Sequence, residues 1–246
     1  MAIGGNMIKN EEKKTSPKQR IIIILIAILM LGSTFALYAG LVLNYNNPTS
    51  SSTKTSEKQK RFDELYAEYQ EQIDKQASEL SKVHFDEFSQ YKNRVKGFNK
   101  EGANELKVTD LKVGSGREIT EISDIDYAAY YIGWLSDETV FDSSFDNFDN
   151  PTSLISPLEG STNMIEGWLE GIARSTEEDG SLIWEGMRIG GIREITIPSA
   201  LAYGDTDQGE IPAGSPLKFV VMLIERPEEV EASEELQELY AELYGY

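Results

Sequence analysis

The stretch that most constrains the fold runs from Met187 to Pro212, MRIGGIREITIPSALAYGDTDQGEIP. It opens with Gly190-Gly191, which predicts a tight turn because glycine adopts backbone conformations that other residues avoid. Residues 192–197 then alternate as a strand does. Pro198 ends this strand, because proline has no N–H to donate to a neighbouring strand. The segment therefore predicts a turn, a core strand and a loop.

Tyr203 stands in that loop, between the small residues Ala202 and Gly204. A tyrosine between two core strands usually only packs against the core. With small neighbours, its ring is instead expected to lie over an opening, where the hydroxyl can bind solvent or a ligand. The loop ends at Pro212, and a long apolar strand is predicted over residues 217–224.

Three more motifs occur upstream in a fixed order: YYIG at 130–133, VFDSS at 140–144 and MIEGWLEG at 164–171. With G-x-R-x-x-I-P-x-x-L-A-Y-G after them, the series resembles an FKBP-type peptidyl-prolyl isomerase domain over residues 104–226. The resemblance implies an α+β fold, in which a curved antiparallel β-sheet wraps around one short α-helix. It also implies an isomerase that needs no cofactor.

Local patterns give the expected elements of this domain. Strands are predicted over 107–113 and 125–135, and the short helix over 165–172, with Asn163 as its candidate N-cap. Residues 175–185 form an acidic insertion where the resemblance implies a shorter connection.

Rotation about an X-Pro bond breaks amide resonance and requires no nucleophile or metal ion. An apolar cavity favours the twisted, less dipolar imide, so catalysis would arise from tighter binding of the twisted conformer. By the resemblance, Trp168 would form the floor under the proline ring. The Tyr203 hydroxyl and the backbone N–H of Ile165 would donate hydrogen bonds, and Asp142 would hold Tyr131 and the pocket rim.

The predicted site divides into two sets of residues. The catalytic set is Tyr203, Asp142, Tyr131 and Phe141. The substrate-binding set is Trp168, Ile165, Met164, Phe219 and Ile211. The plainer alternative is that these aromatic residues only form a core, in which Phe and Trp are common. Glu210 and Met164 depart from the family pattern, and Glu210 would disfavour acidic peptides.

Composition excludes several kinds of site. The chain has no cysteine and one histidine, His84, which excludes disulfides, thiolate catalysis and His-based triads or metal sites. FDSSFDNFDN offers Asp142, Asp146 and Asp149 to a cation, but it lacks the Gly and the Glu of a calcium loop, so no metal ion is expected. The net charge of −19 argues against nucleic acid. It favours solubility or, more specifically, a cationic partner.

The start of the chain predicts a membrane anchor. Residues 1–20 are polar and basic, whereas residues 21–43 carry no charge. As a helix rising ~1.5 Å per residue, this run spans a hydrocarbon core of ~30 Å. The basic flank places the N-terminus in the cytoplasm and the rest of the chain outside the cytoplasmic membrane, as in a bacterial single-pass protein. A cleaved signal peptide is the alternative, but Leu37-Tyr38-Ala39 fits a cleavage site poorly.

Residues 44–103 predict a linker and a helical stalk. Residues 44–56 are rich in Asn, Ser and Thr, whereas 57–98 carry an apolar stripe at helical spacing. Such a stripe needs a partner, which is a second copy in a homodimer, a hairpin, or the domain itself. The acidic tail at 227–246 predicts a helix from Glu228, and its ELYAEL repeats the stalk's ELYAEY, which hints that the two helices associate.

The sequence thus predicts a membrane-anchored peptidyl-prolyl isomerase that assists protein folding outside the cytoplasmic membrane. The resemblance implies X-Pro-containing polypeptides as substrates and macrolide inhibitors of the FKBP family as ligands. Two alternatives stay open, a peptide-holding chaperone module with little turnover and a surface assembly protein on a helical stalk.

Overall fold

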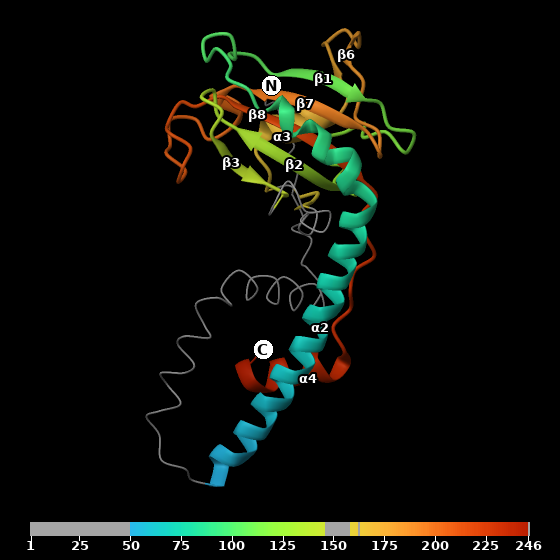
Figure 1. Cartoon of the computed structure of the whole chain (residues 1–246), viewed down its shortest axis with the longest axis vertical. Coiled ribbons are helices and arrows are strands. Elements are labelled where there is room, and N and C mark those ends of the chain that lie inside the picture. The colour runs from blue at the N-terminus through green and yellow to red at the C-terminus, as the bar shows by residue number, and fades with distance from the viewer. Residues whose placement is uncertain (1–49, 146–157, 162, 246) are drawn as a thin grey trace, which may run out of the picture. The chain divides into compact units, whose positions relative to one another are not determined.

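The computed structural model describes residues 50–145, 158–161 and 163–245, and the predicted anchor at 21–43 lies outside them (Figure 1). These residues form two compact units, one of 50–69 with 231–245 and one of 70–230. Within the described part of the chain, no helix combines the length and the apolar character that a membrane crossing requires.

A six-stranded antiparallel sheet is the centre of the larger unit. It confirms the FKBP-like sheet implied by the sequence, with β7 and β8 at their predicted bounds. Along the sheet the order is β1 (Lys107–Lys112), β7 (Ile192–Ile197), β8 (Leu217–Ile224), β2 (Ala128–Trp134) and β3 (Val140–Ser143), and β4 (Leu158–Glu159) also pairs with β2.

The short helix α3 (Glu166–Ile172) packs on one face of this sheet. Two glycines make the close approach possible. A Cβ on Gly167 would lie 2.3 Å from Ile197 Cγ2, and one on Gly171 would lie 2.7 Å from Ile195 Cγ2. The prediction of Asn163 as the N-cap is wrong, because the helix begins one residue after Ile165, whose carbonyl accepts the first N–H bonds.

The other face of the sheet is buried by the end of the long helix α2 (Ser50–Phe88) and the 3-10 turn η1 (Ser89–Arg94). Phe88 has no exposed surface, and its ring stacks on Phe145 at 5.2 Å. Burial on both faces explains why β2 and β8 read as nearly continuous apolar runs.

Helix α2 begins at Ser50, so the prediction of a linker is wrong for residues 50–56. No proline or glycine follows Pro48 in this segment, and Ser and Thr oppose a helix only weakly, so the helix extends back from the stalk. The stalk helix also ends at Phe88, before the predicted end at 98, and the chain continues as η1.

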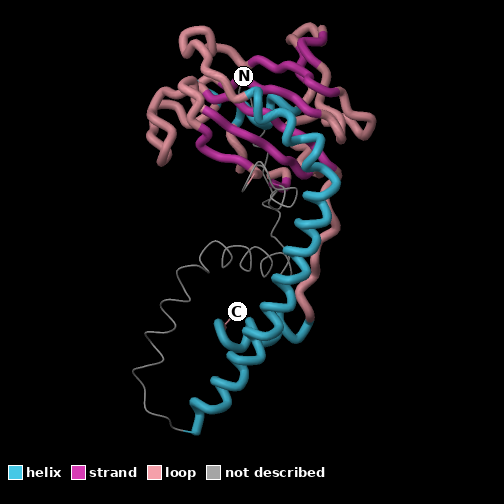
Figure 2. The backbone as a smooth tube through the Cα atoms, in the orientation of Figure 1, coloured by secondary structure: helices cyan, strands magenta, loops and turns pink. Residues whose placement is uncertain are grey.

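The smaller unit pairs the first part of α2 with the tail helix α4 (Glu234–Tyr244), which confirms that the two repeats associate (Figure 2). Phe62 and Tyr240 are buried there, and Arg61 donates two hydrogen bonds of 2.7 Å to Glu235. The tail helix begins at Glu234 and not at the predicted Glu228, because Ser233 caps it by accepting the Leu236 N–H at 3.2 Å. A homodimer through the stalk stays a prediction.

The insertion at 175–185 forms a small hairpin of β5 (Ser175–Thr176) and β6 (Leu182–Trp184). Trp184 attaches it to the domain, since its indole N–H donates to the Ala173 carbonyl at 3.0 Å. The insertion is therefore an ordered addition to the end of α3.

Candidate active site

Three aromatic rings from three elements meet beside α3. Trp168 comes from α3, Tyr131 from β2 and Phe219 from β8. The Trp168 and Phe219 rings lie 5.3 Å apart at 88°, and the Trp168 and Tyr131 rings lie 5.6 Å apart at 90°. Edge-to-face contacts of this kind fix each ring against its neighbours. The group is therefore a rigid aromatic corner.

Phe141 on β3 extends this corner, with its ring 5.5 Å from that of Phe219 at 85°. The contact depends on Gly133, which lies opposite Phe219 in the sheet. A Cβ at this position would lie 2.6 Å from Phe219 and 2.7 Å from Phe141. The Gly of the YYIG motif is therefore a packing requirement, which the sequence reading did not assign.

Asp142 and Tyr131 form the polar edge of the corner. The Tyr131 hydroxyl donates to Asp142 Oδ2 at 2.6 Å, and Asp142 Oδ1 accepts the Ser143 N–H at 2.8 Å. Burial raises the pKa of Tyr131, and the adjacent Asp142 carboxylate and Tyr203 raise it further. Tyr131 thus remains a neutral donor, and Asp142 serves as its acceptor.

Ser144 completes this arrangement and was missed by the sequence reading. Its hydroxyl accepts the Tyr131 N–H at 2.9 Å, and its own N–H donates to the Tyr131 carbonyl at 2.8 Å. The signal was present in the second Ser of VFDSS, since a buried hydroxyl beside an edge strand needs a partner.

Tyr203 lies in the turn after η2 (Ser199–Leu201) and is 39 % exposed. Gly204 follows it with a φ of 57°, a left-handed conformation that favours glycine. The Gly204 N–H donates to the Ser199 carbonyl at 2.8 Å, and the Gly204 carbonyl accepts the Gly214 N–H at 2.8 Å. The backbone of the turn is thus held in place while the Tyr203 ring remains accessible.

The other predicted substrate-binding residues differ in burial. Met164 and Ile165 are half-buried and pack against the same core cluster as Trp168. Ile211 is only 6 % exposed and is part of that core cluster. Glu210 beside it is exposed. Asp146 and Asp149 lie outside the described residues, so the cation site considered there is untested.

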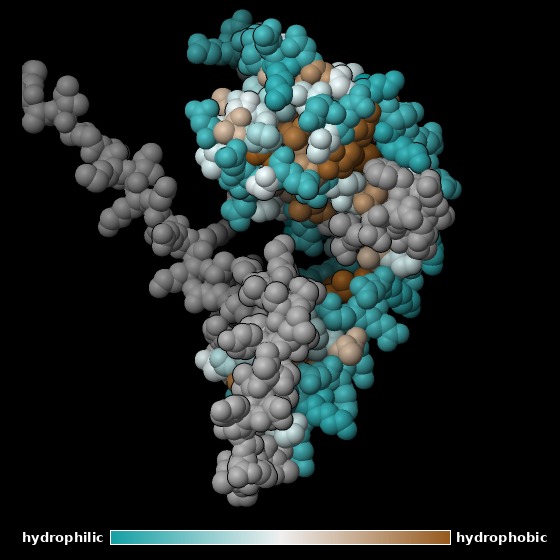
Figure 3. Space-filling view, turned by 60° about the vertical axis from the view of Figure 1, so that its left-hand side comes forward, coloured by the Kyte–Doolittle hydropathy of each residue, from teal (hydrophilic) through white to brown (hydrophobic). Residues whose placement is uncertain are grey.

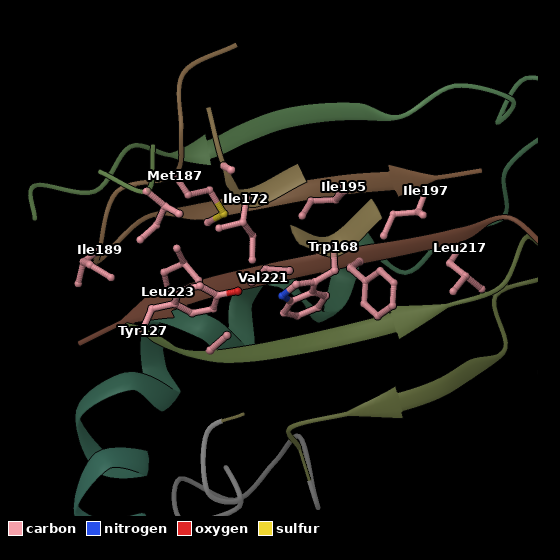
Figure 4. Packing of buried hydrophobic residues seen from close by; sticks show 14 of the residues in the cluster. Tyr127, Trp168, Ile172, Met187, Ile189, Ile195, Ile197, Leu217, Val221 and Leu223 are labelled. Carbon is pink, nitrogen blue, oxygen red and sulfur yellow. The ribbon is translucent and has the colours of Figure 1, made fainter. Parts of the chain in front are cut away.

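Trp168 itself is more enclosed than the sequence reading expected of a pocket floor, at 3 % exposed. Figure 4 shows its indole nitrogen pointing toward the Tyr127 hydroxyl. That hydroxyl donates to Met164 Sδ at 3.7 Å. Burial raises the pKa of the Tyr127 hydroxyl, and the contact with the Trp168 indole N–H opposes this shift. Trp168 is thus part of the core and of the aromatic corner at once.

A cavity of about 310 Å³ lies away from this corner, next to the C-terminal end of α3 and the N-terminal end of β7. Its charged side chains neutralise one another. Arg174 donates to Glu118 at 2.8 Å, and Arg188 donates to the same carboxylate at 3.4 Å. Figure 3 shows hydrophobic residues at the surface of the described chain, between hydrophilic ones. The aromatic corner is therefore the better candidate for binding an apolar ligand.

Comparison with known proteins gives one consistent family. The profile of the FKBP-type peptidyl-prolyl cis-trans isomerases matches residues 123–224. The chain is 35% identical to an FK506-binding protein of Neisseria meningitidis serogroup A over 120 residues, which cover 48% of this chain and 94% of that protein. It is 41% identical to FK506-binding protein 2 of Debaryomyces hansenii over 98 residues, which cover 40% of this chain and 61% of that protein.

Among solved structures, the chain is similar to AtFKBP13, with 32% sequence identity and a TM-score of 0.39. That match covers 50% of this chain and 93% of AtFKBP13.

Proposed function

The chain belongs to the family of FKBP-type peptidyl-prolyl cis-trans isomerases, and from this premise we propose that its aromatic corner isomerises X-Pro bonds in polypeptides. The observation that supports this proposal most is the packing of Tyr131 and Phe219 edge-to-face against Trp168. These rings form a rigid apolar group, and the exposed Tyr203 lies close enough to Tyr131 to raise the pKa of its hydroxyl.

Isomerisation of an X-Pro bond requires no nucleophile, metal ion or proton transfer from the protein. The barrier to rotation is about 18–20 kcal/mol because the planar imide is stabilised by resonance. Aromatic surroundings remove water from the bond, and the twisted imide loses less solvation than the planar, more dipolar one. Binding the twisted conformer more tightly than either planar isomer lowers the barrier. No proton needs to move, so Asp142 acts here by holding Tyr131 and not as a base.

Two donors could orient the substrate. The Tyr203 hydroxyl is accessible, and the Ile165 N–H donates no hydrogen bond to any residue that the structure describes. Phe141 and Phe219 would enclose the proline ring from the sheet side. A macrolide that inhibits the FKBP family would occupy the same surface, which the names of the relatives support.

A protease-coupled assay tests the activity. The full chain is mixed with an X-Pro-Phe peptide and a protease that cleaves only the trans form. We expect the slow phase, which takes tens of seconds without a catalyst, to accelerate with protein concentration and to return to the uncatalysed rate when FK506 is added. An uncatalysed rate at every concentration would reject the isomerase, and saturable peptide binding without turnover would support the peptide-holding alternative.

We also propose that residues 21–43 anchor the chain in a membrane with the catalytic unit outside the cytoplasm. The support is the uncharged run at 21–43 and the basic flank before it. Alkaline carbonate should leave the chain in the membrane fraction, and external protease should digest the C-terminal unit in spheroplasts while sparing an N-terminal tag. Release by carbonate would refute the anchor. Relatives occur in a yeast and in bacteria, so a bacterial source stays a prediction.

A further inference from the structure

Three of the segments around the aromatic corner carry only acidic charged residues. These segments are β3, α3 and the loop from β7 to β8, and residues 140–145, 163–173 and 198–217 contain no Lys or Arg. The acidic side chains in these segments are Asp142, Glu166, Glu170, Asp205, Asp207 and Glu210.

Four of these carboxylates have no ion-pair or hydrogen-bond partner among the described residues. Asp142 is occupied by Tyr131, and Asp207 accepts the Ala213 N–H at 2.7 Å. The remaining four have neither kind of contact, and they are Glu166, Glu170, Asp205 and Glu210. We call these four the rim acids.

Two rim acids adjoin residues of the proposed site. Glu166 directly follows Ile165, and Glu210 directly precedes Ile211. Both carboxylates are exposed, so each can reach the flank of a bound peptide. Burial raises the pKa of Glu170, and the nearby Glu166 carboxylate raises it further because like charges repel.

The six arginines of the larger unit do not pair with the rim acids, because each is bound to another carboxylate. Arg193 is 1 % exposed and donates to Asp110 at 2.7 Å, and Arg94 donates to Glu194 at 2.6 Å. The other four pair with carboxylates in the same way: Arg117 with Asp124, Arg174 and Arg188 with Glu118, and Arg226 with Glu159. Lys218, the first cation after the loop, donates to Glu194 at 3.0 Å.

We propose that this site, if it isomerises X-Pro bonds as proposed above, selects prolines that are preceded by a lysine or an arginine. The proline ring would rest on the rings of Trp168 and Phe219, whose contacts are apolar. In this binding mode the residue before the proline would pass Glu166 beside Ile165 or Glu210 beside Ile211. The rim acids would attract a cationic side chain before the proline and repel an acidic one. They would not change the binding of a peptide with an uncharged side chain at this position.

The test compares three peptides that differ only before the proline, Ala-Lys-Pro-Phe, Ala-Gln-Pro-Phe and Ala-Glu-Pro-Phe, with the full chain. An attraction between two unit charges about 6–8 Å apart in water predicts a kcat/KM about two- to threefold higher for Lys than for Gln. The Glu peptide should be slower than the Gln peptide by a similar factor. Raising the salt to about 0.5 M should bring the three values together.

Charge-neutral variants test whether the rim acids cause the preference for Lys over Glu before the proline. Glu166→Gln and Glu210→Gln should each reduce the Lys-to-Glu ratio by about twofold. Glu178→Gln is the matched control, because it removes the same charge from an exposed residue of the β5–β6 hairpin and should leave the ratio unaltered.

Failure of this inference and failure of the proposed function look different. Equal turnover of the three peptides, or a ratio that Glu178→Gln lowers as much as Glu210→Gln does, overturns the charge preference and leaves the isomerase intact. If no peptide is turned over, the proposed function fails. Peptide binding followed by tryptophan fluorescence then decides the preference, and equal Kd values for the Lys and Glu peptides would overturn it.

Discussion

Tyr130 and Tyr131 are neighbours on β2, but they lie on opposite faces of the sheet because successive side chains of a strand alternate. Tyr130 is fully buried beneath α2, and its hydroxyl has no hydrogen-bond partner among the described residues. Tyr131 is half-buried, and its hydroxyl donates to Asp142 at 2.6 Å. Burial raises the pKa of both hydroxyls, so both are neutral at physiological pH.

The comparison shows that aromatic content does not distinguish a core from a site. The face beneath α2 contains Phe88, Tyr130 and Trp134, and the opposite face contains Tyr131, Trp168 and Phe219. One face is closed by a helix of the same chain. The other keeps accessible polar groups at its edge, which a ligand can use. Substitutions on the two faces should therefore affect different properties.

The largest expected effect is on the closed face. Phe88→Ala removes a ring with no exposed surface that stacks on Phe145, so the free energy of unfolding should fall by about 3–5 kcal/mol. Urea unfolding measures this change. Turnover per folded molecule should stay within about twofold. Val83→Ala, a substitution at a residue that is 71 % exposed on the same helix, should change the unfolding free energy by less than about 0.5 kcal/mol. A large loss of turnover in Phe88→Ala would show that the two faces are not independent.

Trp168→Leu should affect both properties. It removes the ring on which the proline of the substrate would rest, so kcat/KM should fall by about ten- to hundredfold. Because Trp168 is 3 % exposed, the unfolding free energy should fall as well, by about 1–3 kcal/mol. Turnover is measured at a temperature where circular dichroism shows the variant folded. Lower stability with unchanged kcat/KM would place Trp168 in the core alone.

Matched hydroxyl deletions compare the two neighbours directly. Tyr131→Phe removes a hydrogen bond to a carboxylate and should lower the unfolding free energy by about 1 kcal/mol, with a few-fold loss of turnover. Tyr130→Phe removes a buried hydroxyl without a partner and should leave stability unchanged or raise it by up to about 1 kcal/mol. Thermal melts measure the stability of both variants, and the coupled assay measures their turnover. Equal losses of stability would mean that the two hydroxyls are equivalent.

Tyr203→Phe should lower turnover alone. Loss of one neutral hydrogen bond to the substrate, worth about 0.5–1.5 kcal/mol, predicts a two- to tenfold decrease in kcat. Tyr203 is exposed, so stability should stay within about 0.5 kcal/mol. Activity and melting temperature are measured on the same preparation. A clear drop in melting temperature with unchanged turnover would assign Tyr203 to the core.

The smallest effect concerns His84, whose ring lies 5.8 Å from that of Tyr130 on the closed face. Burial lowers its pKa, Glu87 opposes this shift and Lys112 adds to it. The folded state therefore favours the neutral His84 ring. Its contribution to the free energy of unfolding is present above the unfolded-state pKa of about 6.5 and is lost as the pH falls below that value. As the only histidine, His84 can be titrated by NMR without overlap. The urea midpoint should fall more between pH 7.5 and 5 for the native chain than for His84→Gln, and identical pH profiles would exclude this role.

The elements of the domain follow from the sequence where the signals are local. The alternation at 192–197 and the proline after it fix both ends of β7, and the apolar run at 217–224 fixes β8. The roles of Gly133 and Ser144 in the site could not be predicted from the sequence, because they depend on contacts with residues of other strands. A spacing pattern indicates which face a residue occupies but not which atom it meets there.

The sequence by itself determined the antiparallel sheet, the short helix and the series of aromatic motifs, because turns, proline stops and period-two alternation act between near neighbours. Only the tertiary structure decided what covers the apolar stripe of the stalk. Phe62 packs against the tail helix, and Phe88 closes one face of the sheet and leaves Tyr131 on the other. These partners are far away in the sequence, and the choice among them depends on how completely each surface buries the same rings.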